Sequence, residues 1–550
     1  MKWWQKTIAY ELYPKSFLDT AGQGTGTIRG IIEKLDYLSS LGIGAVWMTP
    51  VCRSPMVDNG YDIADYTEID PSYGTMEDMD ELFAKAKEHG IRIVMDLVFN
   101  HTSDQNPWFL ASKQSRNNPY SDWYIWRDAK EDGSAPTNWR GIFGGSAWTW
   151  CEKRQQYYLH TFAVQQPDLN WANPEVRRAL YKAANFWIDK GVGGFRVDAI
   201  TYIRKPDVFE DGTPDAEDGS VSIHDMTANT PGILDYLHEF KREVADGHDI
   251  FTVAEANGVS ADELQYWVGQ DGAFDMLFEF SHVNLEFKGI ETWCRPDPWE
   301  LKDLKKALVN SQTATKDNGW YPIFFENHDK PRCVDHFFKA GTDPKKAAKV
   351  IGMVLYTLRG TPFLFQGQEL GLGNVKWPSI DCYNDISSYG QYDFAIQEGF
   401  SEAEAIACVH AFSRDSARTP MQWNGEENAG FTKGKPWLPV HDDYAVMNVE
   451  AEEKDPDSVL NWYRQLAAIR QEETVLTEGD FSELMKESNE VFAYARSKGD
   501  QKAVILANFS DHEVTVDPDL IKNMQVKISS VKDHAEGVLA PLETVLYISC

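Results

Sequence analysis

The chain has 550 residues, of which 42% are hydrophobic, so it can bury a large core and is not expected to be disordered or fibrous. Lys and Arg number 53 against 85 Asp and Glu, and the resulting net charge of −32 disfavours nucleic acid, anionic membranes and anionic substrates as partners. No stretch offers the roughly 20 apolar residues that cross a bilayer, and the N-terminus has no signal-peptide pattern. The seven cysteines are scattered without a C-x-x-C motif, which favours reduced thiols in a cytoplasmic protein.

Short runs rich in Val, Ile, Phe and Met predict eight buried strands. In chain order they are residues 8–14, 45–51, 92–100, 193–199, 251–256, 276–280, 322–329 and 362–369. Helical patterns lie between many of them, at 28–41, 75–89, 175–190 and 343–358, and the second begins with Thr75 and Asp78 in capping-box spacing. Strands joined by helical crossovers predict an α/β protein with a parallel (β/α)₈ TIM barrel. A doubly wound sheet is the alternative, but no G-x-G-x-x-G follows the early strands.

Two segments are too long to be simple loops of such a barrel. The polar, aromatic-rich stretch 103–173 is predicted to form a small domain inserted after the third strand, and a second insertion runs over about 370–456. From 478 to 550, short strands predict a C-terminal β-sandwich domain. The catalytic barrel would then comprise residues 1–102 and 174–477.

The stretch GFRVD ends the fourth predicted strand with charged residues on one face. Side chains alternate along a strand, so Arg196 and Asp198 point to the same side, at the carboxyl end where barrels carry their active sites. A buried Arg beside a carboxylate is expected to lower the pKa of Asp198 and hold it ionised. A purely structural ion pair is the alternative for these two residues taken alone.

Other predicted strands end with polar residues at the same rim. The third ends with Asp96, Asn100 and His101, the fifth with Glu255, and the seventh with His328 and Asp329. Apolar neighbours would raise the pKa of Glu255 and suit it to donating a proton. Paired carboxylates with neutral histidines are typical of glycoside cleavage, and an aromatic content of 13% suits stacking on sugar rings.

Four motifs make this chemistry specific. DLVFNHTS (96–103), GFRVDAI (194–200), TVAEA (252–256) and ENHDKPR (326–332) resemble the four signature regions of the α-amylase superfamily, glycoside hydrolase family 13. QQPDLNW (165–171) resembles an additional region of its oligo-1,6-glucosidase branch, as do YPKSF, DNGYDI, FGGSAW, QGQELG and RDSARTPMQW. The resemblance therefore covers nearly the whole chain.

The resemblance implies roles for individual residues. Asp198 corresponds to the nucleophile, Glu255 to the general acid/base, and Asp329 to the carboxylate that binds sugar hydroxyls and stabilises the transition state. Asp62 and Arg418 correspond to a pair that closes the non-reducing end and makes an enzyme exo-acting, and the family retains anomeric configuration. The implied substrate-binding residues are Tyr61, Asp62, His101, Phe162, Arg196, His328 and Arg418.

The chain departs from its relatives at a loop that often binds metal through the pattern DxNxDGxGD. Here the loop reads DTAGQGTGT, in which Asp19 remains but Ala21, Gln23 and Thr27 replace the other side-chain ligands. Calcium requires six to eight oxygen ligands, so we expect no metal at this loop and no cofactor elsewhere.

The residue after the nucleophile leaves the substrate open. Relatives devoted to α-1,6 bonds usually have Val there, whereas this chain has Ala199, which leaves room for maltose or sucrose as well as isomaltose. Trehalose-6-phosphate hydrolases usually have Ala where this chain has Pro167, and sucrose isomerases share RGTPFLFQGQELG (359–371). Non-catalytic relatives generally lose the carboxylates that are present here. The expected partner is a small oligosaccharide, without nucleic acid or membrane, and the oligomeric state stays open.

Overall fold

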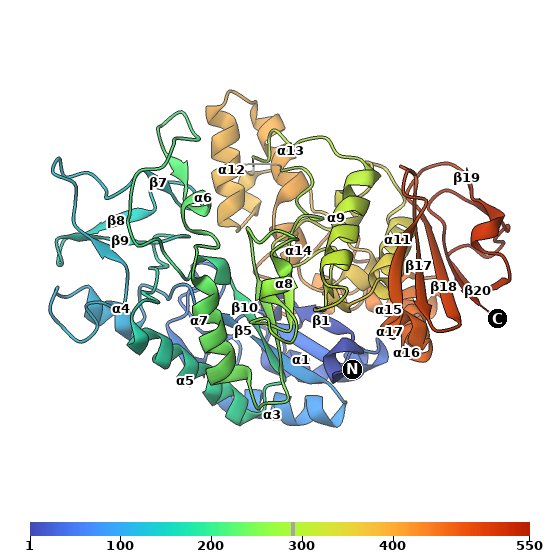
Figure 1. Cartoon of the computed structure of the whole chain (residues 1–550), viewed down its shortest axis with the longest axis horizontal. Coiled ribbons are helices and arrows are strands. Elements are labelled where there is room, and N and C mark those ends of the chain that lie inside the picture. Colours follow the sequence, from blue (N-terminus) through green and yellow to red (C-terminus); the bar gives the residue numbers. More distant parts are fainter. Residues whose placement is uncertain (288–291, 550) are drawn as a thin grey trace. The chain divides into compact units, whose positions relative to one another are not determined.

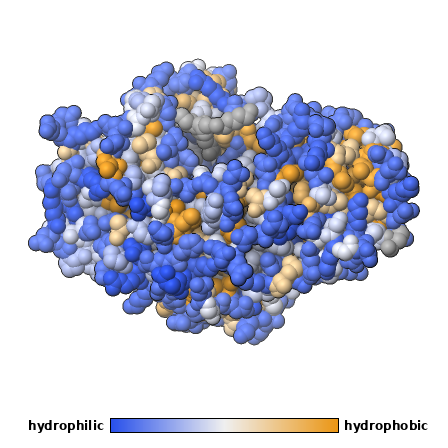
Figure 2. Space-filling model, in the orientation of Figure 1, coloured by the Kyte–Doolittle hydropathy of each residue, from blue (hydrophilic) through white to orange (hydrophobic). Residues whose placement is uncertain are grey.

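The computed structural model describes residues 1–287 and 292–549. These residues pack as two compact units (Figure 1). Unit 1 comprises Met1–Val46, Lys85–Ile91 and Phe280–Cys550, and unit 2 comprises Trp47–Ala84 and Arg92–Glu279. Hydrophilic side chains cover most of the face seen in Figure 2, and among the described helices none is long and apolar enough to span a membrane.

Three of the predicted strands that end in polar residues lie side by side in unit 2. β5 (Arg92–Val98), β10 (Gly194–Asp198), β12 (Phe251–Glu255) and β13 (Met276–Phe278) are neighbours in the order β13-β12-β10-β5, and β2 (Ala45–Met48) follows β5. β10 pairs in parallel with β5 and β12, and β12 pairs in parallel with β13, with Arg196 opposite Asp96 on one side and Val253 on the other. The carboxyl ends of β5, β10 and β12 therefore share one edge.

In unit 1, the strands β1 (Ala9–Leu12), β15 (Thr361–Phe365) and β14 (Pro322–Ile323) are neighbours in that order and pair in parallel. All eight predicted strands are thus present, each within or next to its predicted range.

The predicted helices are also present, with one break. α3 (Met76–Glu88), α5 (Pro174–Lys190) and α11 (Pro344–Thr357) match their predicted ranges. The capping box of α3 forms, because the Thr75 N–H donates to Asp78 and the Asp78 N–H donates to Thr75. The segment 28–41 is instead two helices, α1 (Ile28–Glu33) and α2 (Leu35–Ser40), separated at Lys34, whose ψ of 11° lies outside the helical range.

Further elements surround these sheets. The helices are α4 (Pro107–Ser112), α6 (Ile223–Thr227), α7 (Ile233–Phe240), α8 (Leu264–Trp267), α9 (Leu301–Ala314), α10 (Cys333–His336), α14 (Asp415–Arg418), α15 (Val449–Lys454), α16 (Val459–Glu472) and α17 (Thr474–Glu478). The short strands are β3 (Cys52–Arg53), β4 (Asp65–Ile69), β7 (Trp139–Arg140) and β11 (Val221–Ser222).

The two predicted insertions contain structure of their own. In unit 2, β6 (Trp126–Arg127), β9 (Gln156–Leu159) and β8 (Trp148–Cys151) form a three-stranded antiparallel sheet inside the first insertion. In unit 1, the second insertion contributes α12 (Ile386–Gln397) and α13 (Glu402–Phe412), drawn in orange in Figure 1. The predicted domain boundaries themselves stay a prediction.

The C-terminal segment of unit 1 forms antiparallel sheets, as predicted. The strands β16 (Asp480–Leu484), β17 (Val491–Lys498), β18 (Gln501–Asn508), β22 (Thr544–Ser549) and β20 (Met524–Ser529) form one sheet in that order (red in Figure 1). β19 (Val514–Thr515) and β21 (Val538–Leu539) form a second. Alternate residues of β17 and β18, among them Val491, Ala493, Val504 and Leu506, pack in one buried core.

Candidate active site

One buried guanidinium organises the carboxylates of unit 2. Arg196 on β10 is 2% exposed, and its Nη1 lies 2.9 Å from Asp96 Oδ1 and 2.7 Å from Asp198 Oδ1. Its Nη2 lies 2.7 Å from Glu255 Oε2. The parallel register explains the cluster, because Asp96 is opposite Arg196, Asp198 lies two residues on, and Glu255 ends the adjacent strand. Three carboxylates therefore share one cation.

The pKa of Asp198 is raised well above its ordinary value, contrary to the predicted lowering. Burial is the largest cause; Arg196 opposes it, but the charges of Glu255 and Asp96 add to the rise. Asp198 also lies within hydrogen-bonding reach of Glu255. The prediction was wrong because burial outweighs Arg196, whose guanidinium is also shared with Asp96 and Glu255. Asp198 and Glu255 therefore compete for one guanidinium.

Glu255 does not lie in the apolar setting that was predicted. Its Oε2 accepts hydrogen bonds from Arg196 Nη2 at 2.7 Å and from the backbone N–H of Ala199 at 3.0 Å. Ala199 has a φ of 43°, in the left-handed region that non-glycine residues rarely adopt. This backbone turn directs the amide of the residue after Asp198 toward Glu255.

His101 lies in a polar pocket of unit 2 beside two other predicted binding residues. Its Nε2 is 3.0 Å from the carbonyl of Tyr61, and its ring centroid is 5.2 Å from that of Phe162. Burial lowers the pKa of His101, so the imidazole is neutral, as predicted. The Tyr61 hydroxyl donates to Asp96 Oδ2 at 3.0 Å, which connects this pocket to the Arg196 cluster.

Asp62 fixes the loop that leads to Tyr61. Its carboxylate accepts hydrogen bonds from Ser54 Oγ and from the backbone N–H groups of Val57 and Asp58, at 2.9 to 3.1 Å. Burial raises the pKa of Asp62 to about 6 against these hydrogen bonds. A carboxylate has room for about four hydrogen bonds, so one more donor can be accepted.

Asp329 in unit 1 differs from Asp198, because three cationic groups contact its one carboxylate. Asp329 Oδ1 lies 2.6 Å from Arg418 Nη2 and 3.2 Å from Arg414 Nη1, and Oδ2 lies 3.1 Å from His328 Nε2. Although burial raises it, these three cationic groups hold the pKa of Asp329 well below its ordinary value. Asp329 is therefore ionised at neutral pH.

His328 is protonated, which corrects the prediction of two neutral histidines. Burial lowers its pKa, but Asp329 and Glu11, whose Oε1 is 2.6 Å from Nδ1, raise it to about 9. Arg418 completes the cluster, since its Nε donates to the His328 carbonyl at 2.9 Å. Its buried Nη1 has no hydrogen-bond partner in the described part of the chain, which leaves a donor for a ligand oxygen.

The loop that corresponds to a metal-binding loop in relatives, residues 19–27, is stabilised by hydrogen bonds to the Asp19 carboxylate. Asp19 accepts hydrogen bonds from the N–H groups of Ala21, Gly22 and Gly24 and from Thr432 Oγ1. Four donors face one carboxylate, so the donor set around Asp19 is the reverse of what a cation requires.

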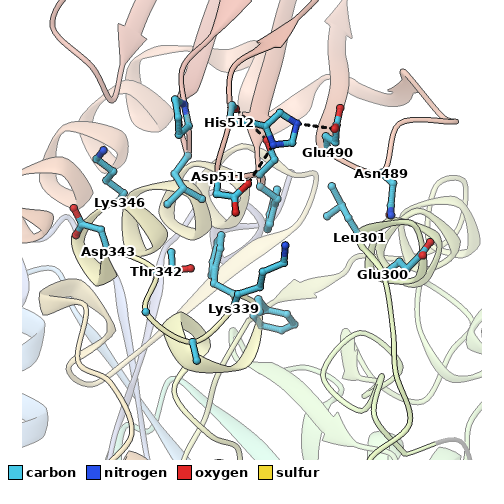
Figure 3. A pocket seen from close by; sticks show the side chains of 18 of the residues that line it. Glu300, Leu301, Lys339, Thr342, Asp343, Lys346, Asn489, Glu490, Asp511 and His512 are labelled. Atoms are coloured by element: carbon cyan, nitrogen blue, oxygen red, sulfur yellow. Dashed lines mark hydrogen bonds and ion pairs between the residues drawn. The ribbon is translucent and has the colours of Figure 1, made fainter.

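A cleft of about 780 Å³ lies elsewhere in unit 1, among the N-terminus of α9, the segment between α10 and α11, and loops of the C-terminal sheets (Figure 3). Within this cleft, His512 Nε2 lies 2.8 Å from Glu490 Oε1, and Nδ1 lies 3.2 Å from Asp511 Oδ1. None of the predicted site residues is among the described residues that line it.

Several polar residues of these clusters were not predicted. Arg414 lies within the motif RDSARTPMQW, but only Arg418 of that motif was assigned a role. Lys205 and Asp168 form a buried ion pair of 2.8 Å in unit 2. Asp168 belongs to the motif QQPDLNW, whereas Lys205 lies in a loop and carries no sequence signal.

A family model described as the catalytic domain of α-amylase matches residues 11–479. The chain belongs to the α-amylase family of glycoside hydrolases. It is 42% identical to the oligo-1,6-glucosidase of Parageobacillus thermoglucosidasius over 511 residues, which are 92% of this chain and 91% of that protein. The barrel with a C-terminal β domain is accordingly the fold of this chain, as predicted.

Solved structures of the α-amylase family are similar over the whole chain. A trehalose-6-phosphate hydrolase from Bacillus licheniformis has a TM-score of 0.94 at 40% identity and covers 100% of both chains. An isomaltulose synthase from Protaminobacter rubrum has a TM-score of 0.93 at 39% identity, covering 100% of this chain and 99% of that one. Similar backbones therefore carry different reactions, and the substrate has to be argued from individual residues.

Proposed function

We propose that this glycoside hydrolase is an exo-acting, retaining α-glucosidase that releases terminal glucose from short oligosaccharides, foremost isomaltose and isomalto-oligosaccharides. The observation that carries the proposal is the pair of 2.7 Å contacts by which Arg196 binds both Asp198 and Glu255. Retaining enzymes need their two carboxyl groups about 5–5.5 Å apart, whereas inverting enzymes need room for a water between them. Two carboxyl groups on one guanidinium favour the closer arrangement.

In the proposed reaction, an Asp198 oxygen attacks the anomeric carbon while Glu255 gives its proton to the glycosidic oxygen, and the bond to the leaving sugar breaks. Glu255 then takes a proton from water, whose oxygen displaces Asp198 and releases glucose with retained configuration. This step requires Glu255 to be protonated and Asp198 to be ionised, and the 2.7 Å contact of Arg196 stabilises the ionised Asp198.

The binding residues are assigned by their motifs and their local chemistry. We assign Asp329 to the stabilisation of the transition state, because its carboxylate is permanently ionised. The substrate-binding groups are proposed to be Tyr61, Asp62, His101, Phe162, Arg196, His328 and Arg418. Asp62 and Arg418 are proposed to close the non-reducing end, as the resemblance of their motifs implies.

A phosphorylated substrate is the weaker candidate. It needs a cation free to bind phosphate, yet Arg196 and Lys205, two buried cations of unit 2, are both paired with carboxylates of the same unit. The net charge of −32 also disfavours it. Maltose and sucrose remain candidates because Ala199 leaves space beside the nucleophile.

The test is glucose release by the purified protein from isomaltose, maltose, sucrose and trehalose 6-phosphate at equal concentration. We expect isomaltose to be cleaved fastest, with α-glucose as the first product in proton NMR spectra. First release of β-glucose would contradict retention. Cleavage of trehalose 6-phosphate alone would contradict the substrate assignment.

A further inference from the structure

A buried lysine in unit 2 makes contacts that the proposed reaction does not use. The Lys205 side chain is 4% exposed, and its Nζ lies 2.8 Å from Asp168 Oδ2 and 3.0 Å from Asn100 Oδ1, while it also donates to the Tyr202 carbonyl. An ammonium group has three N–H donors, and three acceptors surround this one. Lys205 is therefore fully engaged within the protein.

These contacts fix the orientation of the Asn100 amide. Its Oδ1 accepts from Lys205, and its Nδ2 lies 3.2 Å from both Asp168 Oδ1 and His101 Nδ1. A flipped amide would turn its oxygen toward the Asp168 carboxylate and its NH₂ group toward the Lys205 ammonium. Both contacts would then be repulsive, so Asn100 presents a donor to His101.

The amide in turn decides which nitrogen of His101 carries the proton. Because Asn100 donates to Nδ1, that nitrogen must be an acceptor, and the hydrogen of the neutral ring resides on Nε2, 3.0 Å from the Tyr61 carbonyl. Gln166 Nε2 lies 3.2 Å from the same nitrogen and 3.3 Å from the same carbonyl, so both groups donate to Tyr61.

We infer that Lys205, acting with Asp168 through Asn100, is a positioning residue that fixes His101 as the neutral Nε2–H tautomer. The ring then donates its one N–H to the Tyr61 carbonyl and accepts from Asn100 at Nδ1, which fixes its orientation beside the subsite where the terminal glucose is proposed to bind. This inference rests on the proposed function for its catalytic consequence, but the tautomer itself does not depend on the substrate. The competing explanation is that Lys205 only neutralises Asp168.

A second buried lysine provides a matched control. The Lys305 side chain, in unit 1, is 1% exposed, and its Nζ lies 2.8 to 3.1 Å from the carbonyls of Met485, Lys486 and Ser488. Lys205→Met and Lys305→Met each remove a buried ammonium of similar exposure, so both should lower the melting temperature. Only Lys205→Met should also lower kcat/KM on the best natural substrate, by about 100-fold, as expected when a binding group is misplaced.

The tautomer is read directly from the ring nitrogens of His101 in nitrogen-15 NMR spectra of the full-length protein, assigned with His101→Gln. Wild type and Lys305→Met should show a protonated Nε2 and an unprotonated Nδ1. Asn100→Asp keeps a partner for Lys205 but places an acceptor opposite Nδ1, and should protonate that nitrogen. It thus tests the inference even where Lys205→Met fails to fold. The charged groups that act on this ring are Asp168, Asp58 and Lys205.

An unchanged His101 spectrum in Asn100→Asp, or an equal loss of kcat/KM in the two lysine variants, would overturn the inference. Failure of the proposed function is distinguishable, because it would appear as an absence of glucose release by wild type while the NMR result still stands.

Discussion

Asp198 in unit 2 and Asp329 in unit 1 both lie beside cationic groups, but the number of cations that contact each carboxylate differs. In unit 2, Asp96, Asp198 and Glu255 share the single guanidinium of Arg196, and the pKa of Asp198 rises. In unit 1, the carboxylate of Asp329 is contacted by three cationic groups, those of Arg414, Arg418 and His328, and its pKa falls. The number of cations that contact each carboxylate, more than burial alone, decides whether its pKa rises or falls.

The largest effect is expected from Asp198→Asn, which removes the proposed nucleophile at nearly constant volume. We expect kcat on isomaltose to fall by about 10⁴-fold or more, because covalent catalysis is lost. Asp96→Asn is the matched control, since it removes another carboxylate from the same guanidinium. Similar losses in the two variants, measured by glucose release from folded proteins, would mean that Asp198 acts only through charge.

Glu255→Gln should have the next largest effect, and one that depends on the leaving group. Loss of a general acid typically lowers the rate by about 10²–10⁴-fold, so kcat on isomaltose should fall by that amount. An aryl α-glucoside with an acidic phenol needs little protonation, so its release of phenol in the first turnover should fall much less. Equal losses on both substrates in stopped-flow measurements would remove Glu255 from the role of proton donor.

The charged groups around Asp329 in unit 1 should make the free energy of unfolding depend on pH. The folded pKa of His328 is about 9, above the ordinary value of about 6.5, so its contribution of about 3 kcal/mol is present below pH 6.5 and is lost as pH rises through 9. We expect the free energy of unfolding to fall by that amount between about pH 6 and pH 10, and less in His328→Gln.

The control is His101→Gln, because the pKa of His101 is lowered, so this ring does not lose a stabilising proton as pH rises. Denaturant titrations of the three proteins at both pH values would refute the charge balance of the Asp329 cluster if wild type and His328→Gln lost equal stability.

The fold could be predicted from local patterns because each strand is a short buried run and each βα unit repeats the same signals. The capping residues Thr75 and Asp78 marked the start of α3 correctly. The break at Lys34 between α1 and α2 could not be predicted, because the apolar pattern continues through it. A backbone kink that leaves the buried face unchanged has no hydrophobic signal.

The residues that form the site could be predicted from the sequence, but the electrostatic interactions among them could not. Strand alternation showed that Arg196 and Asp198 share a face, and the structure agrees. It could not show that Asp96 and Glu255, from the two neighbouring strands, would compete for the same guanidinium. Lys205 was missed for the same reason: its acceptor on Asn100 lies 105 residues away in the chain.

The smallest expected effect is on linkage preference, that is, on which glycosidic bond is cleaved at the site around Arg196. Ala199→Val adds two methyl groups beside Asp198 while keeping the N–H that binds Glu255, and one or two such groups typically change discrimination by about 10-fold. We expect the ratio of kcat/KM for isomaltose to that for maltose to rise by about this factor. Because Ala199 has a φ of 43°, the branched side chain should also lower the melting temperature.

Ala199→Gly separates the two consequences of that substitution. Glycine tolerates the left-handed backbone and adds no volume, so it should leave the linkage ratio near that of wild type. A ratio that changes equally with Val and with Gly would show that the backbone turn, through the amide that holds Glu255, governs linkage. A ratio that changes only with Val assigns linkage preference to the space beside the nucleophile, and leaves the charge balance of the cluster to govern rate alone.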